Sequence, residues 1–289
     1  MTQTFDPQLV GAYRARGLLD DGGRAVHLPT ACPRCSACWA GEDPSRVPPP
    51  DHKGHAGRLS APWIGYEYQR GRLVVVLENL RNYGGWDLRA DADKGMRYLG
   101  RCARAGFSEG HRVLFRGGAY AGTRVWTQAV SYAATWLATS RFLTTTWSGV
   151  GVPGAALAEA MDLIAMVQHV RCSPLGHRSN ASAAMWTECG RHVLRDELRI
   201  LGPARMIVLG RDRNAGALAA HVLPHGRVVH ERTVRLGSRT STVRLERRML
   251  EDRSVDVAVV QHPASPGGTS RALVGALRDL VSDLDEGPG

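Results

Sequence analysis

Cysteine spacing gives this chain its clearest candidate for chemistry. Cys32, Cys35 and Cys38 stand within seven residues of a segment rich in proline and glycine, and Cys172 and Cys189 follow far downstream. A C-x2-C pair together with a distant second pair can supply four thiolates to one metal centre. Four thiolates suit either a tetrahedral zinc ion or an iron–sulfur cluster, and the spacing leaves both possibilities open.

The charge balance of the chain favours a polyanionic partner. The 289 residues carry a formal net charge of +10. Only Lys53 and Lys94 are lysines, so 37 − 2 = 35 of the basic side chains are arginine. Arginine binds phosphate through a planar, bidentate group. A GC-rich genome would explain the excess of arginine over lysine, but it would not explain the positive sign of the net charge.

The sequence indicates a soluble protein of the cytoplasm. It contains no stretch near the length of about 20 apolar residues that spans a bilayer, and residues 1–17 lack the apolar core of a signal peptide. We therefore expect no membrane partner. We also expect a monomer. In a reducing compartment, cysteines serve metal binding or catalysis rather than disulfides.

Four short apolar blocks predict buried parallel strands. They are Leu73–Leu77, Leu163–Val170, Arg205–Leu209 and Val255–Val260. Stretches with apolar residues at helical spacing separate them, at 123–141, 182–200, 211–221 and 269–284, and residues 5–20 read as a further helix. Strands that alternate with helices predict a three-layer α/β/α domain around a central, mainly parallel sheet of four strands. Residues 224–250 read as basic β-structure before the last strand.

Several motifs occur in the order found in one known family. Cys172, Pro174 and Cys189 are followed by Leu201, Pro203 and a strand ending at Gly210, and the last strand runs into Gln261-His262-Pro263-Ala264-Ser265. With the upstream C-x2-C pair, this arrangement resembles the iron–sulfur uracil-DNA glycosylases of families 4 and 5. The resemblance spans roughly residues 30–285. It implies one domain over 1–289, with a Cys-rich loop at 27–60 and a helical insertion at about 107–160.

The resemblance implies a structural 4Fe–4S cluster rather than the alternative, zinc. Its ligands would be Cys32 and Cys35 with Cys172 and Cys189. Cys35 and Cys38 have the same spacing as Cys32 and Cys35, so Cys38 could replace Cys32. The cluster would join the N-terminal loop to the loop after the second strand.

The resemblance also implies catalytic roles for three residues. His262 would stabilise negative charge on the departing base, since it follows the last predicted parallel strand, where ligands of open α/β sheets bind. Asn79, preceded by Glu78, stands where some members of the superfamily place a residue that orients water. Leu77, Leu80 and Arg81 replace the glycine and proline that flank this position in the family.

Further residues are expected to contact the base and the DNA. Tyr98 would stack on the base, and Gln168 would read its pairing edge with an amide one methylene longer than the family's asparagine. Arg178, Ser265 and Arg271 would contact the DNA.

Together these features predict a hydrolase that flips uracil or a related altered base out of DNA and cleaves its N-glycosidic bond. A catalytically inactive or repurposed iron–sulfur DNA-binding protein of the same fold is the alternative.

Overall fold

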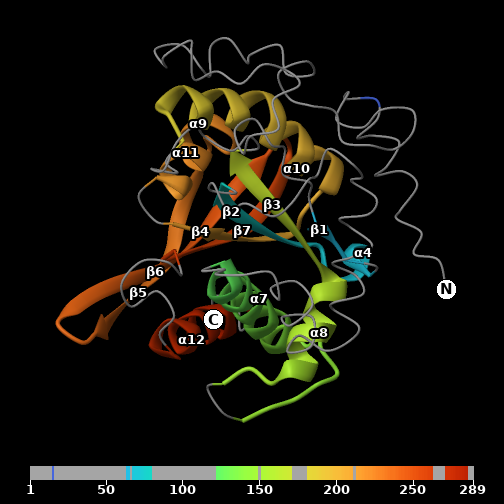
Figure 1. Cartoon of the computed structure of the whole chain (residues 1–289), viewed down its shortest axis with the longest axis vertical. Helices are drawn as coiled ribbons and strands as arrows, with labels where there is room; N and C mark the ends of the chain where they lie inside the picture. The colour runs from blue at the N-terminus through green and yellow to red at the C-terminus, as the bar shows by residue number, and fades with distance from the viewer. Residues whose placement is uncertain are drawn as a thin grey trace.

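The four apolar blocks form neighbouring parallel strands at the centre of one sheet in a computed structural model (Figure 1). The structure describes residues 15, 63–65, 67–79, 122–148, 151–170, 181–210, 213–262 and 271–285. The parallel strands lie in the order β3-β2-β4-β7. Their bounds are β2 (Leu73–Asn79), β3 (Ile164–Val170), β4 (Arg205–Leu209) and β7 (Arg253–Val260).

Apolar and polar residues do not alternate along these strands, because both faces of the strands are covered. Every residue of β3 is buried, as are Leu73 to Leu77 of β2 and Met206 to Leu209 of β4. Buried parallel strands need apolar side chains on both faces, which is why the sequence shows continuous apolar runs. The α/β class expected from the sequence is therefore confirmed.

The expectation of four strands was wrong, because the described residues alone form seven strands of this sheet. The short strand β1 (Trp63–Ile64) pairs antiparallel with β3 at one edge. At the other edge, β5 (Gly226–Leu236) and β6 (Arg239–Leu250) form an antiparallel hairpin, and β6 pairs with β7. The hairpin corresponds to the basic β-structure expected at 224–250. The sequence does not indicate that this hairpin belongs to the sheet, because β5 is exposed and carries no apolar run.

Helices cover both faces of the sheet, as Figure 1 shows. One face is covered by α7 (Gly122–Thr139), α8 (Gly154–Leu163) and α12 (Arg271–Asp285). The other face is covered by α9 (Ala183–Cys189), the π-helical turn η2 (Gly190–Leu194), α10 (Arg195–Leu201) and α11 (Asn214–His221). A short helix, α4 (Tyr68–Gly71), precedes β2. The four described helical stretches thus agree with the sequence-based expectation, although 182–200 is three consecutive segments.

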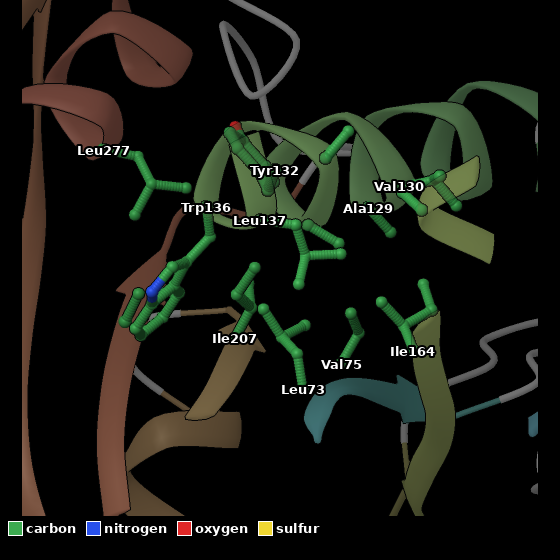
Figure 2. Close-up of a cluster of buried hydrophobic side chains, with 14 of the residues drawn as sticks. Leu73, Val75, Ala129, Val130, Tyr132, Trp136, Leu137, Ile164, Ile207 and Leu277 are labelled. Atoms are coloured by element: carbon green, nitrogen blue, oxygen red, sulfur yellow. The ribbon is translucent and has the colours of Figure 1, made fainter. Parts of the chain in front are cut away.

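The larger core cluster lies between α7, α12 and the sheet (Figure 2). Tyr132, Trp136 and Leu137 of α7 pack toward Leu73 of β2 and Ile207 of β4. These side chains are almost fully buried. The described part of the stretch at 107–160 is therefore a covering layer of the core.

Two sequence-based expectations lie outside the described residues, namely the helix at 5–20, apart from residue 15, and the Cys-rich loop at 27–60. Of the helices that the structure does describe, none combines the length and the apolar character needed to cross a bilayer.

Candidate active site at the carboxyl edge of the parallel strands

The strand order places a topological switch point at the carboxyl ends of β2 and β4. From β2 the chain passes through α7 and α8 to β3, on one side of β2, and then returns to β4 on the other side. The connection after β2 covers one face of the sheet, whereas α11, which follows β4, covers the other. Where neighbouring connections diverge in this way, open α/β sheets bind their ligands beyond the carboxyl ends of the strands.

Glu78 of β2 lies against the backbone of Gly210 at this switch point. Gly210 has a φ of +105°, which disfavours any residue with a side chain. A Cβ atom at this position would lie 2.5 Å from Glu78 Oε1. Glycine therefore leaves room for the Glu78 carboxylate at the end of β4. A larger residue at position 210 would displace this carboxylate.

His262 belongs to the same edge through β7. The Gly210 N–H donates to the Val260 carbonyl at 2.9 Å, and half-buried His262 follows two residues later. Strands β2, β4 and β7 are adjacent and parallel, so their carboxyl ends, with Glu78, Gly210 and His262, meet at one edge. Asn79 is the last residue of β2, and its backbone pairs with Val170.

Gln168 faces the opposite side of the sheet from Glu78. Side chains alternate along a strand, and Gln168 therefore shares a face with Ile164 and Met166, toward α7, α8 and α12. Its side chain is 5% exposed, and its Oε1 atom has no hydrogen-bond partner among the described residues. An expected base-binding amide is thus buried near this edge, separated from Glu78 by the sheet.

A buried polar network joins the ends of β2, β3 and β4, and the sequence analysis did not predict it. The Asn214 Nδ2 atom, at the start of α11, donates to the carbonyls of Leu209 and Val76, at 2.8 and 3.2 Å. Since carbonyls only accept, this fixes the amide orientation, and Asn214 Oδ1 must accept from His169 Nδ1 at 2.9 Å. Asn214 therefore ties the ends of β2, β4 and β3 together. A histidine inside the apolar run LIAMVQHV was the available signal.

His169 is buried in a closely packed site that favours its neutral form. Its ring packs edge-on against Trp186, with ring centroids 4.8 Å apart. Gly190, the first residue of η2, leaves the room it needs, because a Cβ there would lie 2.9 Å from His169 Nε2. Burial lowers the pKa of His169 to about 4, against the opposing hydrogen bond to Asn214.

This lowered pKa predicts loss of stability in acid. The unfolded chain, with an ordinary histidine pKa of about 6.5, takes up a proton before the folded chain does. The free energy of unfolding therefore carries no penalty from His169 above pH 6.5. It falls by about 3 kcal/mol in all as the pH drops from 6.5 toward 4. Urea unfolding at pH 7.5 and 4.5 measures it. We expect His169→Gln to lose less stability than the native protein over this interval, and an equal loss in both would contradict the assignment.

Cys189 is the expected metal ligand that the structure describes. It is buried at the end of α9 and acts electrostatically on His169. Cys32, Cys35, Cys38 and Cys172 lie outside the described residues. Within the described ranges, no group of three His, Cys, Asp or Glu side chains is placed to hold a metal ion.

The remaining expected contacts are described only in part. Arg271 is the exposed first residue of α12. Tyr98, Arg178 and Ser265 lie outside the described residues.

No protein-family model matches the chain, and no curated protein matches it. A case for its function therefore rests on the residues and on the geometry of this edge.

Proposed function

We propose that this protein is a DNA glycosylase that flips uracil or a related altered base out of DNA and hydrolyses its N-glycosidic bond. The observation that carries the proposal is that Glu78 and His262 lie at the carboxyl ends of β2 and β7, on either side of β4, at one edge of the sheet. Of the motifs that resemble family 4 and family 5 glycosylases, Glu78-Asn79 ends β2, Gly210 follows β4 and His262 follows β7 by two residues. The net charge of +10 suits a DNA substrate.

Excision requires stabilisation of charge on both sides of the breaking bond. As the C1′–N bond breaks, the base gains negative charge and the sugar gains oxocarbenium character. In this proposal, the His262 ring donates a hydrogen bond to a carbonyl oxygen of the base. The Glu78 carboxylate stabilises the sugar cation and accepts a proton from the water that adds to C1′. The free base leaves, and an abasic sugar remains.

A structural 4Fe–4S cluster is part of the proposal. Its support is the cysteine spacing, in which Cys172 and Cys189 follow the upstream C-x2-C pair, together with the burial of Cys189 at the end of α9. Cys189 and Cys172 would hold the cluster together with Cys32 and Cys35. The cluster would supply a covalent link between loops and no step of the reaction.

The cluster predicts a coloured protein. Anaerobically purified protein is expected to be brown, to absorb broadly at about 400 nm, and to contain about four irons per chain. We expect Cys189→Ser to lose iron and absorbance, whereas His225→Ala, an exposed change, should keep both. Colourless protein with one zinc ion would contradict the cluster and leave the glycosylase proposal standing.

One observation favours a non-catalytic, iron–sulfur DNA-binding protein as second candidate. Leu77, which replaces the family's glycine, is 4% exposed and packs in the core cluster. Glycine would allow a ligand to approach the backbone closely at this point. The first motif could therefore have lost its role in catalysis.

An excision assay separates the two candidates. Labelled duplexes carrying uracil, damaged bases or hypermodified bases are incubated with excess protein and then heated in alkali, which cleaves abasic sites. The glycosylase proposal predicts strand cleavage at one class of base. Intact strands for every base, with DNA binding retained, would favour the non-catalytic candidate.

A further inference from the structure

The β5–β6 hairpin extends past the rest of the sheet as a two-stranded ribbon (Figure 1). Its last pair with β7 joins Arg244 to Val259, which puts Val243 opposite Val260, so four residues of β6, Arg239 to Thr242, run beyond the carboxyl end of β7. At about 3.3 Å per residue, this overhang measures about 13 Å. It extends past the same end of β7 that leads to His262.

The hairpin is strongly basic. Between Gly226 and Leu250 it holds seven arginines and two glutamates, a difference of 7 − 2 = +5. The arginines are Arg227, Arg232, Arg235, Arg239, Arg244, Arg247 and Arg248.

Four of these arginines have partners within the protein. Arg232 pairs with Asp279 of α12, and Arg247 pairs with Asp256 of β7. Arg244 and Arg248 both pair with the buried Glu246 carboxylate, at 3.2 and 2.6 Å. The first two contacts join the ribbon to α12 and β7, whereas the two with Glu246 lie within β6.

The arginines at the tip have no such partner. Arg235 and Arg239 are exposed on either side of the turn at Gly237 and Ser238, and neither has an ion pair among the described residues. Beyond the carboxyl end of β7 both strands of the ribbon are edges, where charged residues also block pairing with other chains.

Hydroxyl groups accompany Arg235. Thr233 and Thr242 hydrogen-bond across the ribbon at 3.1 Å, and Thr240 pairs with Arg235. By strand alternation, these residues share the face that points away from α12. Arg239 pairs with Leu236 and lies on the other face, where Arg232 reaches Asp279, so the two tip arginines flank the turn on opposite faces of the ribbon. Arginine and threonine side chains are common donors to DNA phosphates.

We propose that the tip of the β5–β6 hairpin binds the phosphate backbone of duplex DNA through Arg235 and Arg239. This inference rests on the proposed function for its choice of DNA. The overhang beyond β7 would place the contact on nucleotides flanking the one held at the carboxyl edge.

The test compares two double variants with equal loss of charge. Arg235→Gln/Arg239→Gln changes the tip, and Arg227→Gln/Arg247→Gln changes a cross-strand pair at the base of the ribbon. Binding to a labelled duplex without an altered base is measured by anisotropy from 50 to 300 mM salt. We expect the tip variant to bind at least about tenfold more weakly, with the salt slope reduced by about 2. The base variant should stay within about threefold of the native protein, after circular dichroism has shown that both are folded.

Equal weakening by both variants would overturn the inference, since net charge alone would then explain binding. Native affinity and slope in the tip variant, or tighter binding of the native protein to duplex RNA than to DNA, would also overturn it. Excision is measured separately at saturating protein. Tip-dependent binding without excision of any base would reject the glycosylase proposal alone, and excision with tip-independent binding would reject the hairpin contact alone.

Discussion

Replacing Asn214 with leucine is expected to lower the free energy of unfolding by at least about 3 kcal/mol. The leucine removes the three buried hydrogen bonds of Asn214, to the carbonyls of Val76 and Leu209 and from the Nδ1–H of His169. Each hydrogen bond contributes about 0.5–1.5 kcal/mol, and a buried polar group left without a partner costs about 1–3 kcal/mol. Globular proteins unfold at a cost of only about 5–15 kcal/mol, so the change removes a large share of stability. Urea unfolding followed by circular dichroism measures it.

Gln168→Leu is the matched control for this experiment. It makes a similar change from amide to apolar side chain at another buried position near the same edge, where Gln168 Oε1 lacks a described partner. We expect its stability to change by less than about 1 kcal/mol. Equal stabilities of the Asn214 and Gln168 variants would show that the network does not hold the strand ends together.

His262→Ala should reduce single-turnover excision by about 10²–10³-fold, the usual loss for one donor to a developing anion. The reduction corresponds to about 3–4 kcal/mol of transition-state stabilisation. Affinity for DNA should change much less, because this hydrogen bond strengthens mainly as the base departs. Rates are measured with protein in excess over a duplex carrying the altered base.

His225→Ala removes an exposed histidine in the loop before β5 and serves as the control. It should excise at the native rate. If His262→Ala kept that rate as well, the role assigned to His262 would be wrong, although another residue at the edge could still catalyse the reaction.

The sequence predicted the centre of the fold because covered parallel strands have a local signature. Leu73 to Leu77 and Arg205 to Leu209 read as apolar runs whatever their neighbours are. Strand β5 gave no comparable signal, because its exposed residues are mostly polar and its pairing with β6 is set by the turn at Gly237. Strand β1 has two residues, too few for a pattern.

At the candidate site, the sequence predicted the positions of only those residues that lie at the ends of strands. His262 and Glu78 follow from their places at or near the ends of β7 and β2. The contact of Glu78 with Gly210 depends on β4 lying beside β2, which no local pattern encodes. The partnership of His169 and Asn214 joins residues 45 positions apart, and it appears only when α11 packs on the sheet.

The central claim is tested most directly by looking for the free base. Native protein is incubated in excess with duplexes that carry uracil, damaged bases or hypermodified bases, and the small-molecule fraction is analysed by mass spectrometry. A glycosylase releases one class of altered base, at the mass of the free base and in amounts equal to the abasic sites formed. His262→Ala should release far less of it over the same time. Protein that carries its metal, binds the duplex and yet releases no base from any of these substrates would contradict the account.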